Sequence, residues 1–249
     1  MLAEIGNIMF THFFKRDLSS PLKDNWVETL PEYVKDGVLC AKENQCSLRI
    51  RDWSAFDFMI PKRMKGKTAR TSDEVILDLR DLSLYPDLRG LSITTNFNLI
   101  QVRNLDALYR LKNLETLSIN TGKMHKFEID VSKITALKEL VLDGYKPGVY
   151  NICKAKQLEV LVLYGYKNSD LSEFADLLNL RDLRLFYSEI KSLDGIENMT
   201  KLEHLEIAWA KNLQDVSALD RLEQKHEIGG VLLPKKFKRK KIKADDKYK

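Results

Sequence analysis

The sequence predicts an α/β solenoid, in which short strands of successive repeats stack on one another with 3₁₀ turns and loops on the outer side. One motif, Leu-x-x-Leu-x-Leu/Ile, occurs six times in the second half of the chain. The first leucines of successive copies are separated by 26, 23, 21, 22 and 22 residues, and a fixed period of this length is typical of solenoids. The copies are Leu88-Leu91-Ile93, Leu114-Leu117-Ile119, Leu137-Leu140-Leu142, Leu158-Leu161-Leu163, Leu180-Leu183-Leu185 and Leu202-Leu205-Ile207.

Residues 1–83 do not repeat, and we expect them to form an N-terminal cap domain that contains a helix and a small β-meander. Between residues 21 and 34, apolar side chains recur every three to four positions, which predicts a helix that Pro31 ends or bends. Alternating apolar residues then predict strands at 48–50 and 56–60, joined by a turn at 52–55. A cap has a physical reason, because the first repeat of a solenoid otherwise exposes an apolar end.

Three further segments complete the expected organisation. Residues 61–70 are polar and basic and predict a loop, whereas Val75, Leu77 and Leu79 alternate and predict another strand within 74–82. Residues 84–227 form the repeats, and apolar residues at every third position between their strands predict short 3₁₀ or extended turns. The first two repeats are longer, which predicts a helical turn or a bulge. Residues 228–249 are expected to hold a short C-terminal cap and a basic, disordered tail.

The segment LRDLRLFYSEIKSLDGIENMTKL, residues 180–202, resembles the short leucine-rich repeats of the internalin type. The resemblance extends from Leu88 to Leu222 and implies a curved solenoid whose concave side is a parallel sheet. One position departs from the family, because the asparagine that bonds the turn backbone after each strand is found only once. That position holds Asn96, Gly122, Tyr145, Tyr166, Ser188 and Ala210. We therefore expect water or loop backbone to satisfy the turns.

Side chains between the inward leucines should face outward on the concave sheet, since side chains alternate along a strand. They are small and polar in the first two repeats, and aromatic, acidic or valine in the last four. Exposed aromatics are enriched at interface hot spots, which favours a partner-binding face. Its predicted residues are Glu139, Val141, Asp143, Val160, Val162, Tyr164, Asp182, Arg184, Phe186, Tyr187, His204, Glu206 and Trp209.

Two alternatives remain open for this face. The aromatic residues just past the strands, Tyr145, Tyr166, Tyr187 and Trp209, either extend the aromatic surface or fold over the strand ends onto the next repeat. The charged residues of the face sum to −3, which favours a partner with a basic surface, but ordinary solvated charges give the same pattern.

The basic tail carries +7 between residues 235 and 249, so the rest of the chain carries −2. Nucleic-acid contact, nuclear targeting in a eukaryote and solubility without further function are all compatible with it, and only Phe237 and Tyr248 offer aromatic stacking. The candidate nucleic-acid contacts are Lys235, Lys236, Lys238, Arg239, Lys240, Lys241 and Lys243.

The sequence predicts no enzyme, no cofactor and no metal site. His204 near Glu206 and Asp182 lacks a nucleophile, and Gly66-Lys67-Thr68 lacks the glycine of a phosphate loop, because Pro61 occupies that position. Three widely spread cysteines, Cys40, Cys46 and Cys153, indicate a reducing compartment. No apolar run is long enough to span a membrane.

These observations predict a monomeric, cytoplasmic protein-protein interaction module, which would also enter the nucleus if the source is a eukaryote. A specific form of this hypothesis resembles bacterial immunity proteins, some of which use repeats to neutralise a basic toxin. The alternative is a nucleic-acid-associated or ribonucleoprotein scaffold that makes contact through the tail.

Overall fold

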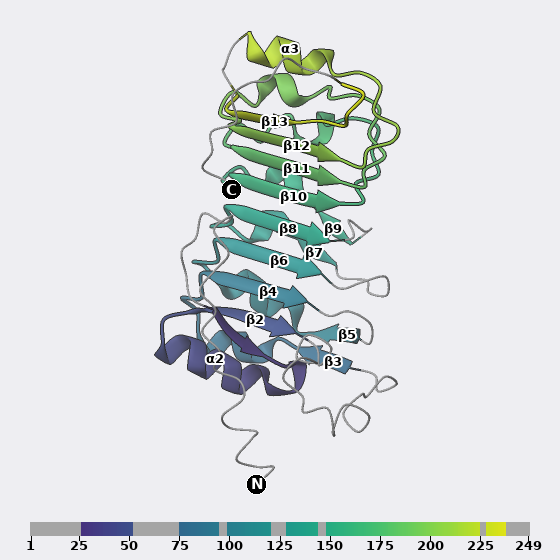
Figure 1. Cartoon of the computed structure of the whole chain (residues 1–249). Coiled ribbons are helices and arrows are strands. Elements are labelled where there is room, and N and C mark those ends of the chain that lie inside the picture. Colours follow the sequence, from purple (N-terminus) through teal and green to yellow (C-terminus); the bar gives the residue numbers. More distant parts are fainter. Residues whose placement is uncertain are drawn as a thin grey trace. The chain divides into compact units, whose positions relative to one another are not determined.

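The computed structural model describes residues 26–51, 75–94, 99–120, 128–143, 148–224 and 228–237. They divide between two compact units, which comprise residues 1–127 (unit 1) and 128–249 (unit 2). Short parallel strands and 3₁₀ helices build both units (Figure 1). This architecture confirms the predicted leucine-rich-repeat fold class.

Unit 1 contains a parallel sheet with the strand order β1-β2-β4-β6. These strands span Trp26–Thr29, Ser47–Arg51, Gly90–Thr94 and Thr116–Asn120. Helix α2, Val34–Glu43, follows the 3₁₀ helix Pro31–Tyr33 and connects β1 to β2. A second small sheet pairs β3, Val75–Asp78, with β5, Leu99–Arg103.

The N-terminal region differs from the predicted helix and meander. Residues 26–29 form a strand, and the helix begins only at Val34. Strand β2 pairs in parallel with both β1 and β4, so the described strands do not form an antiparallel meander. The physical reason is that α2 supplies the long crossover that parallel strands require. The predicted strand at 56–60, its turn at 52–55 and the loop at 61–70 lie outside the described residues.

The remaining predictions for unit 1 can be compared directly. The strand expected within 74–82 is present as β3, although residues 80–84 continue as a 3₁₀ helix. The prediction for the long repeats was a helical turn or a bulge, and the first of them has a six-residue 3₁₀ helix at Leu105–Arg110 and a bulge in β5, where Val75 pairs with Leu99 but Ile76 pairs with Gln101. The predicted boundary at residues 83 and 84 stays a prediction, and β2 and β4 on either side of it are neighbours in one sheet.

Unit 2 contains five parallel strands in the order β8-β10-β11-β12-β13. They span Glu139–Asp143, Val160–Tyr164, Asp182–Phe186, His204–Ala208 and Gly230–Leu232. A two-stranded sheet pairs β7, Ile129–Asp130, with β9, Val149–Tyr150. The outer side holds the predicted 3₁₀ helices, at Val131–Lys133, Ile152–Lys154, Ser172–Phe174 and Ile196–Asn198.

The core of unit 2 follows directly from the repeat. Leu140, Leu161, Leu183 and Leu205 occupy the same level of successive strands and are fully buried. Burying each leucine side chain contributes about 1.5–3 kcal/mol, and no single repeat could bury its own column. Stacking in register therefore both holds this unit together and turns the alternate side chains outward.

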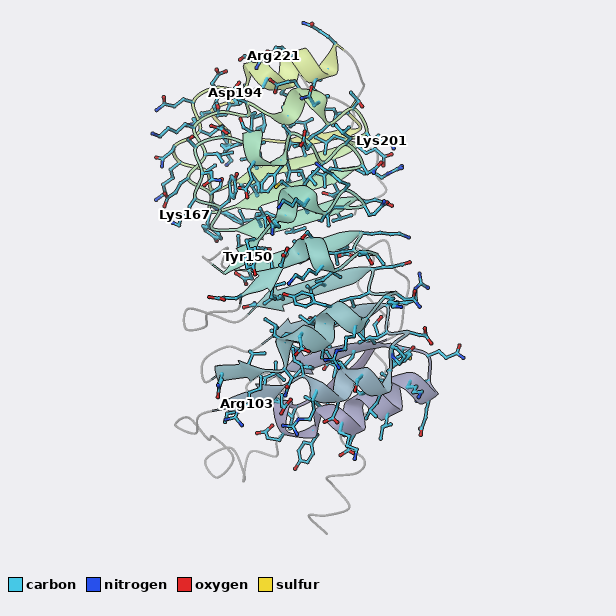
Figure 2. All side chains as sticks on the ribbon, turned by 180° about the vertical axis from the view of Figure 1, so that it is seen from behind. Arg103, Tyr150, Lys167, Asp194, Lys201 and Arg221 are labelled. Atoms are coloured by element: carbon cyan, nitrogen blue, oxygen red, sulfur yellow. The ribbon has the colours of Figure 1, made fainter. Side chains whose placement is uncertain are left out.

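The last helix, α3 at Ser217–Glu223, ends the outer side of unit 2. Arg221 Nη2 donates to Asp194 Oδ1 at 3.0 Å, and both residues are labelled at this end of the unit in Figure 2. No described helix is long and apolar enough to cross a membrane.

Candidate functional site

The outward face of the unit 2 sheet is a regular grid of side chains. In register, β8, β10, β11 and β12 bring Val141, Val162, Arg184 and Glu206 side by side. Most of the predicted partner-binding residues are half-buried, as expected for an open sheet face, whereas Glu139 is only 7% exposed. The structure therefore places the predicted residues on one continuous surface.

Four aromatic side chains on this surface are in contact, and we call them the aromatic strip: Tyr164, Phe186, Tyr187 and Trp209. The rings of Tyr164 and Phe186 stack with centroids 4.6 Å apart, and those of Tyr187 and Trp209 stack at 4.7 Å and 7°. Phe186 and Trp209 join the two pairs at 6.0 Å. The strip therefore crosses three strands without a break.

The backbone of the strip is unusual at two positions. Tyr187 and Trp209 directly follow β11 and β12 and adopt left-handed φ values of 53° and 54°. Gly165 holds the equivalent position after β10, with a φ of 77°. A bulky side chain in this region costs roughly 1–2 kcal/mol relative to its favoured conformation. Despite this cost, Tyr187 and Trp209 remain 58% and 60% exposed.

Tyr166 resolves the open question about the residues past the strands, because it does not belong to the strip. When the two repeats are aligned, Gly165 matches Tyr187 and Tyr166 matches Ser188. Tyr166 is fully buried. Its ring packs on Phe174 at 5.2 Å, and its hydroxyl donates to the Asp170 carbonyl at 3.1 Å. Tyr145 lies outside the described residues.

Ser188 and Ala210, which align with Tyr166 at the family's asparagine position, are likewise buried. Loop backbone satisfies part of the turns, as predicted. The Glu189 amide donates to the Tyr166 carbonyl at 2.8 Å, and the Gly165 amide donates to the Phe186 carbonyl at 2.7 Å.

Acidic groups flank the aromatic strip. Burial raises the pKa of the Tyr164 hydroxyl, and the nearby carboxylates of Asp143 and Glu206 raise it further. Arg184, the positive group among the predicted residues, bonds the carboxylate of Asp182 through Nε at 2.9 Å and Nη2 at 2.6 Å. The face is therefore negative around exposed aromatic rings.

One further strand contributes to this face, and the leucine motif did not predict it. Strand β13 extends the sheet, and Leu232 lies beside Glu206 with 55% of its surface exposed. His204 sits close to Gly230, where a Cβ atom would lie only 2.8 Å from the imidazole Nδ1. Residues 230–232 read Gly-Val-Leu and lack the leucine motif, so the repeat pattern gave no signal for this strand.

The outward face of unit 1 has a different character. The side chains that we predicted to be small, polar and outward include Gly90, Ser92 and Thr116, and all three are buried. Trp26 lies across this face, because a Cβ atom on Gly90 would be 3.0 Å from Trp26 Cη2 and 2.5 Å from Ser47 Oγ. Glycine at position 90 therefore makes room for the indole ring.

Other candidate chemistry adds little to these two faces. Among the described residues, no group of three or more His, Cys, Asp or Glu could hold a metal ion. Cys40, Cys46 and Cys153 are free thiols, and burial raises the pKa of Cys40, which makes it a poor nucleophile. Lys235 and Lys236 are exposed, whereas the other predicted nucleic-acid contacts, Lys238, Arg239, Lys240, Lys241 and Lys243, lie outside the described residues.

No protein-family model and no curated protein matches the sequence. Among solved structures, an internalin from Listeria monocytogenes is 19% identical with a TM-score of 0.45, and the match covers 75% of this chain and 58% of that one. The structure of a TLR13–ssRNA13 complex is 18% identical with a TM-score of 0.50, covering 83% and 27%. A leucine-rich-repeat protein from Leptospira interrogans is 16% identical with a TM-score of 0.42, covering 75% and 58%.

These similarities concern the fold alone, because the identities are low, and this chain spans only 58% and 27% of the first two structures. The chain's own parallel strands, their regular register and the 3₁₀ helices of the outer side indicate the same fold. This protein therefore has a leucine-rich-repeat fold.

Proposed function

We propose that this chain is a protein-protein interaction module whose partner docks on the outward face of the unit 2 sheet. The observation that carries the proposal is the backbone of Tyr187 and Trp209, which holds two large aromatic rings in left-handed conformations at the surface. Tyrosine and tryptophan are the residue types most enriched among interface hot spots.

The repeat itself does not require aromatic residues at these positions. Gly165 fills the same turn after β10 without strain, because glycine readily adopts positive φ. Tyr187 and Trp209 therefore carry both a conformational cost and the cost of exposing apolar surface. Burial against a partner would offset both costs, and the strip would then form the centre of an interface.

The flanking charges favour a partner with a basic surface. Asp143 and Glu206 lie close enough to Tyr164 to raise its pKa, so the negative potential is centred on the strip. Complementary charge would steer a basic partner toward the aromatic rings and disfavour acidic competitors. Nucleic-acid phosphates would be repelled from the same face.

The setting and purpose of this binding belong to the same proposal. Free thiols at Cys40, Cys46 and Cys153 support a reducing, intracellular compartment. An inhibitory or immunity-type role would suit a module that covers a basic surface with aromatic anchors, and no catalytic step is needed for it. We propose no enzymatic activity for this chain.

The test is affinity capture from native lysate with the intact chain and with the double variant Tyr164→Ala, Phe186→Ala. We expect a captured partner with the intact chain and its loss with the double variant, whose circular dichroism and thermal unfolding should keep the folded signature. Tyr150→Ala is the matched control, because Tyr150 is a 46% exposed aromatic residue of the same unit that lies on β9, outside the main sheet (Figure 2). Equal capture by the intact chain and the double variant would contradict the proposal.

A further inference from the structure

The outward face of strands β1 and β2 in unit 1 carries a group of hydrogen-bond donors that the proposed function does not use. In register, Trp26 lies beside Ser47 and Glu28 lies beside Arg49. Because side chains alternate along strands, Arg51 shares this face, whereas Val27, Leu48 and Ile50 point into the core and are at most 1% exposed. The face is thus separate from the aromatic strip of unit 2.

Two guanidinium groups on this face share a single carboxylate. Arg49 Nη1 and Arg51 Nη1 donate to the same oxygen, Glu28 Oε1, at 3.0 and 3.2 Å. Glu28 is 3% exposed, whereas the two arginine side chains are 30% and 31% exposed. The three groups therefore carry a net charge of +1, and the arginines remain reachable from solvent.

Three donors on this face have no partner among the residues that the structure describes. They are Trp26 Nε1, Ser47 Oγ and Arg51 Nε, and each atom is buried. Trp26 and Ser47 are only 3% and 2% exposed as whole residues. Buried polar groups in folded proteins are almost always paired, so three unpaired groups on two adjacent strands call for an explanation.

Each of these three groups lacks an acceptor, and because Arg51 lies four residues along β2 from Ser47, the acceptor of Arg51 is separate from that of Trp26 and Ser47. An indole N–H and the guanidinium N–H groups only donate, and the serine hydroxyl also has a proton to give. Glu28 binds Nη1 of Arg51, which leaves the edge formed by Nε and Nη2, and that edge matches the two oxygens of a carboxylate. A monoanion would also balance the net charge of +1, whereas a dianion beside Glu28 would leave an excess of negative charge.

We propose that this face of unit 1 binds a carboxylate, held in bidentate fashion by Arg51 with Arg49 beside it. The guanidinium of Arg49 lies 5.1 Å from the centroid of the Trp26 ring, which fixes its position next to the site. The carboxylate is supplied either by a free small acid or by an Asp or Glu side chain of an acidic peptide. Both sources present the same group to Arg51.

The experiment follows the indole N–H signals of the intact ¹⁵N-labelled chain by nuclear magnetic resonance, with the Trp26 signal assigned from Trp26→Phe. Sodium acetate and a poly-glutamate peptide are titrated separately, against sodium chloride at equal ionic strength. We expect a saturable shift of the Trp26 signal with at least one carboxylate and none with chloride. Saturation by acetate alone would identify a small-acid site, and far tighter saturation by the peptide would identify an acidic segment.

Variants make the result specific. Arg51→Gln should lower the affinity for the carboxylate by about tenfold or more, the usual cost of losing a charge-assisted hydrogen bond. Arg49→Lys keeps the charge and serves as a second test if Arg51→Gln does not fold. Arg110→Gln is the matched control, because Arg110 pairs with Asp106 at 2.7 Å elsewhere in unit 1, and it should leave the titration unchanged. A shift that never saturates, or that survives unchanged in both site variants, would overturn the proposal.

Discussion

The two units present the same kind of parallel sheet, yet their outward faces are opposite in character. In unit 1, Trp26 reaches Gly90 beside Ser47, and Arg49 and Arg51 both donate to the buried carboxylate of Glu28. In unit 2, aromatic rings remain exposed and carboxylates flank them. Strand geometry alone therefore does not decide what a solenoid face does. The side chains that alternate with the leucines decide it.

The comparison also separates two uses of tryptophan. Trp26 is 3% exposed and Trp209 is 60% exposed, although each residue lies on or beside an outward sheet face. The first has the burial of a core residue, and the second has the exposure of a binding residue.

The largest expected effect comes from truncating the buried indole. Trp26→Ala should lower the free energy of unfolding by about 3–5 kcal/mol, because a large buried side chain is lost and a cavity remains. Trp209→Ala should lower it by about 1 kcal/mol or less, since most of that ring already contacts water. Urea unfolding of both variants measures the difference, and similar losses would show that the two faces are not distinct.

A smaller effect is expected at Gly90. Gly90→Ala should destabilise the chain by about 1–3 kcal/mol, because the new methyl group would overlap Ser47 Oγ at 2.5 Å and its Cβ at 2.9 Å. Gly229→Ala in unit 2 is the control, since its Cβ would meet only the Glu203 carbonyl at 3.5 Å. If Gly90→Ala unfolds at the same urea concentration as the control, Ser47 and Trp26 do not pack closely on Gly90.

The strained turns of unit 2 should tolerate glycine. Trp209→Gly relieves the left-handed backbone but loses the stacking on Tyr187, two effects of about 1 kcal/mol each and of opposite sign. We therefore expect the free energy of unfolding to change by less than about 1 kcal/mol. A loss well above this value in thermal or urea unfolding would mean that Trp209 serves the fold rather than binding.

The smallest effect is expected from acid. The guanidinium of Arg80 is the main reason that the pKa of Asp78 falls from 3.8 to about 2. Because the folded value is the lower one, this carboxylate stabilises the fold above its unfolded pKa, and the contribution disappears as the pH falls through about 2. Asp78→Asn should therefore reduce stability at neutral pH but make little difference at about pH 2. A variant that is equally destabilised at both values would contradict this assignment.

Similar turns should make unit 2 sensitive to acid as well. Hydrogen bonds from the second residue along the chain lower the pKa of Asp130, Asp170 and Asp215 as well. The acid branch of the stability curve should accordingly be shared between the units, unlike the mutational effects above.

The sequence predicted unit 2 far better than unit 1, for a physical reason. In unit 2 every strand repeats the same inward leucines, so register and outward residues follow from counting. In unit 1 the first two strands lack the motif, and the three-to-four spacing around Trp26 and Leu30 suggested a helix where β1 pairs with β2. Residues 26–29 form a strand because they pair with the distant segment β2, and the local spacing of apolar residues carries no information about that pairing.

The candidate site shows a second limit of counting. The positions of Tyr164 and Phe186 followed from strand alternation, but Tyr166 turned inward because Gly165 before it adopts a positive φ. A shift of one residue therefore decides whether the ring is buried or exposed. Aligning Gly165 with Tyr187 and Trp209 would have predicted that Tyr166 is buried. Contacts such as the stacking of Tyr187 on Trp209 depend on backbone angles, which the pattern does not specify.

The binding role of the aromatic strip is tested most directly by isothermal titration calorimetry, with the captured partner titrated into the intact chain and into the double variant Tyr187→Gly, Trp209→Gly. We expect a folded variant whose affinity for the partner falls by at least about thirtyfold, the equivalent of one interface hot spot of about 2 kcal/mol. An unchanged affinity in a folded variant would contradict the central claim that these two strained aromatic residues form the centre of the binding face.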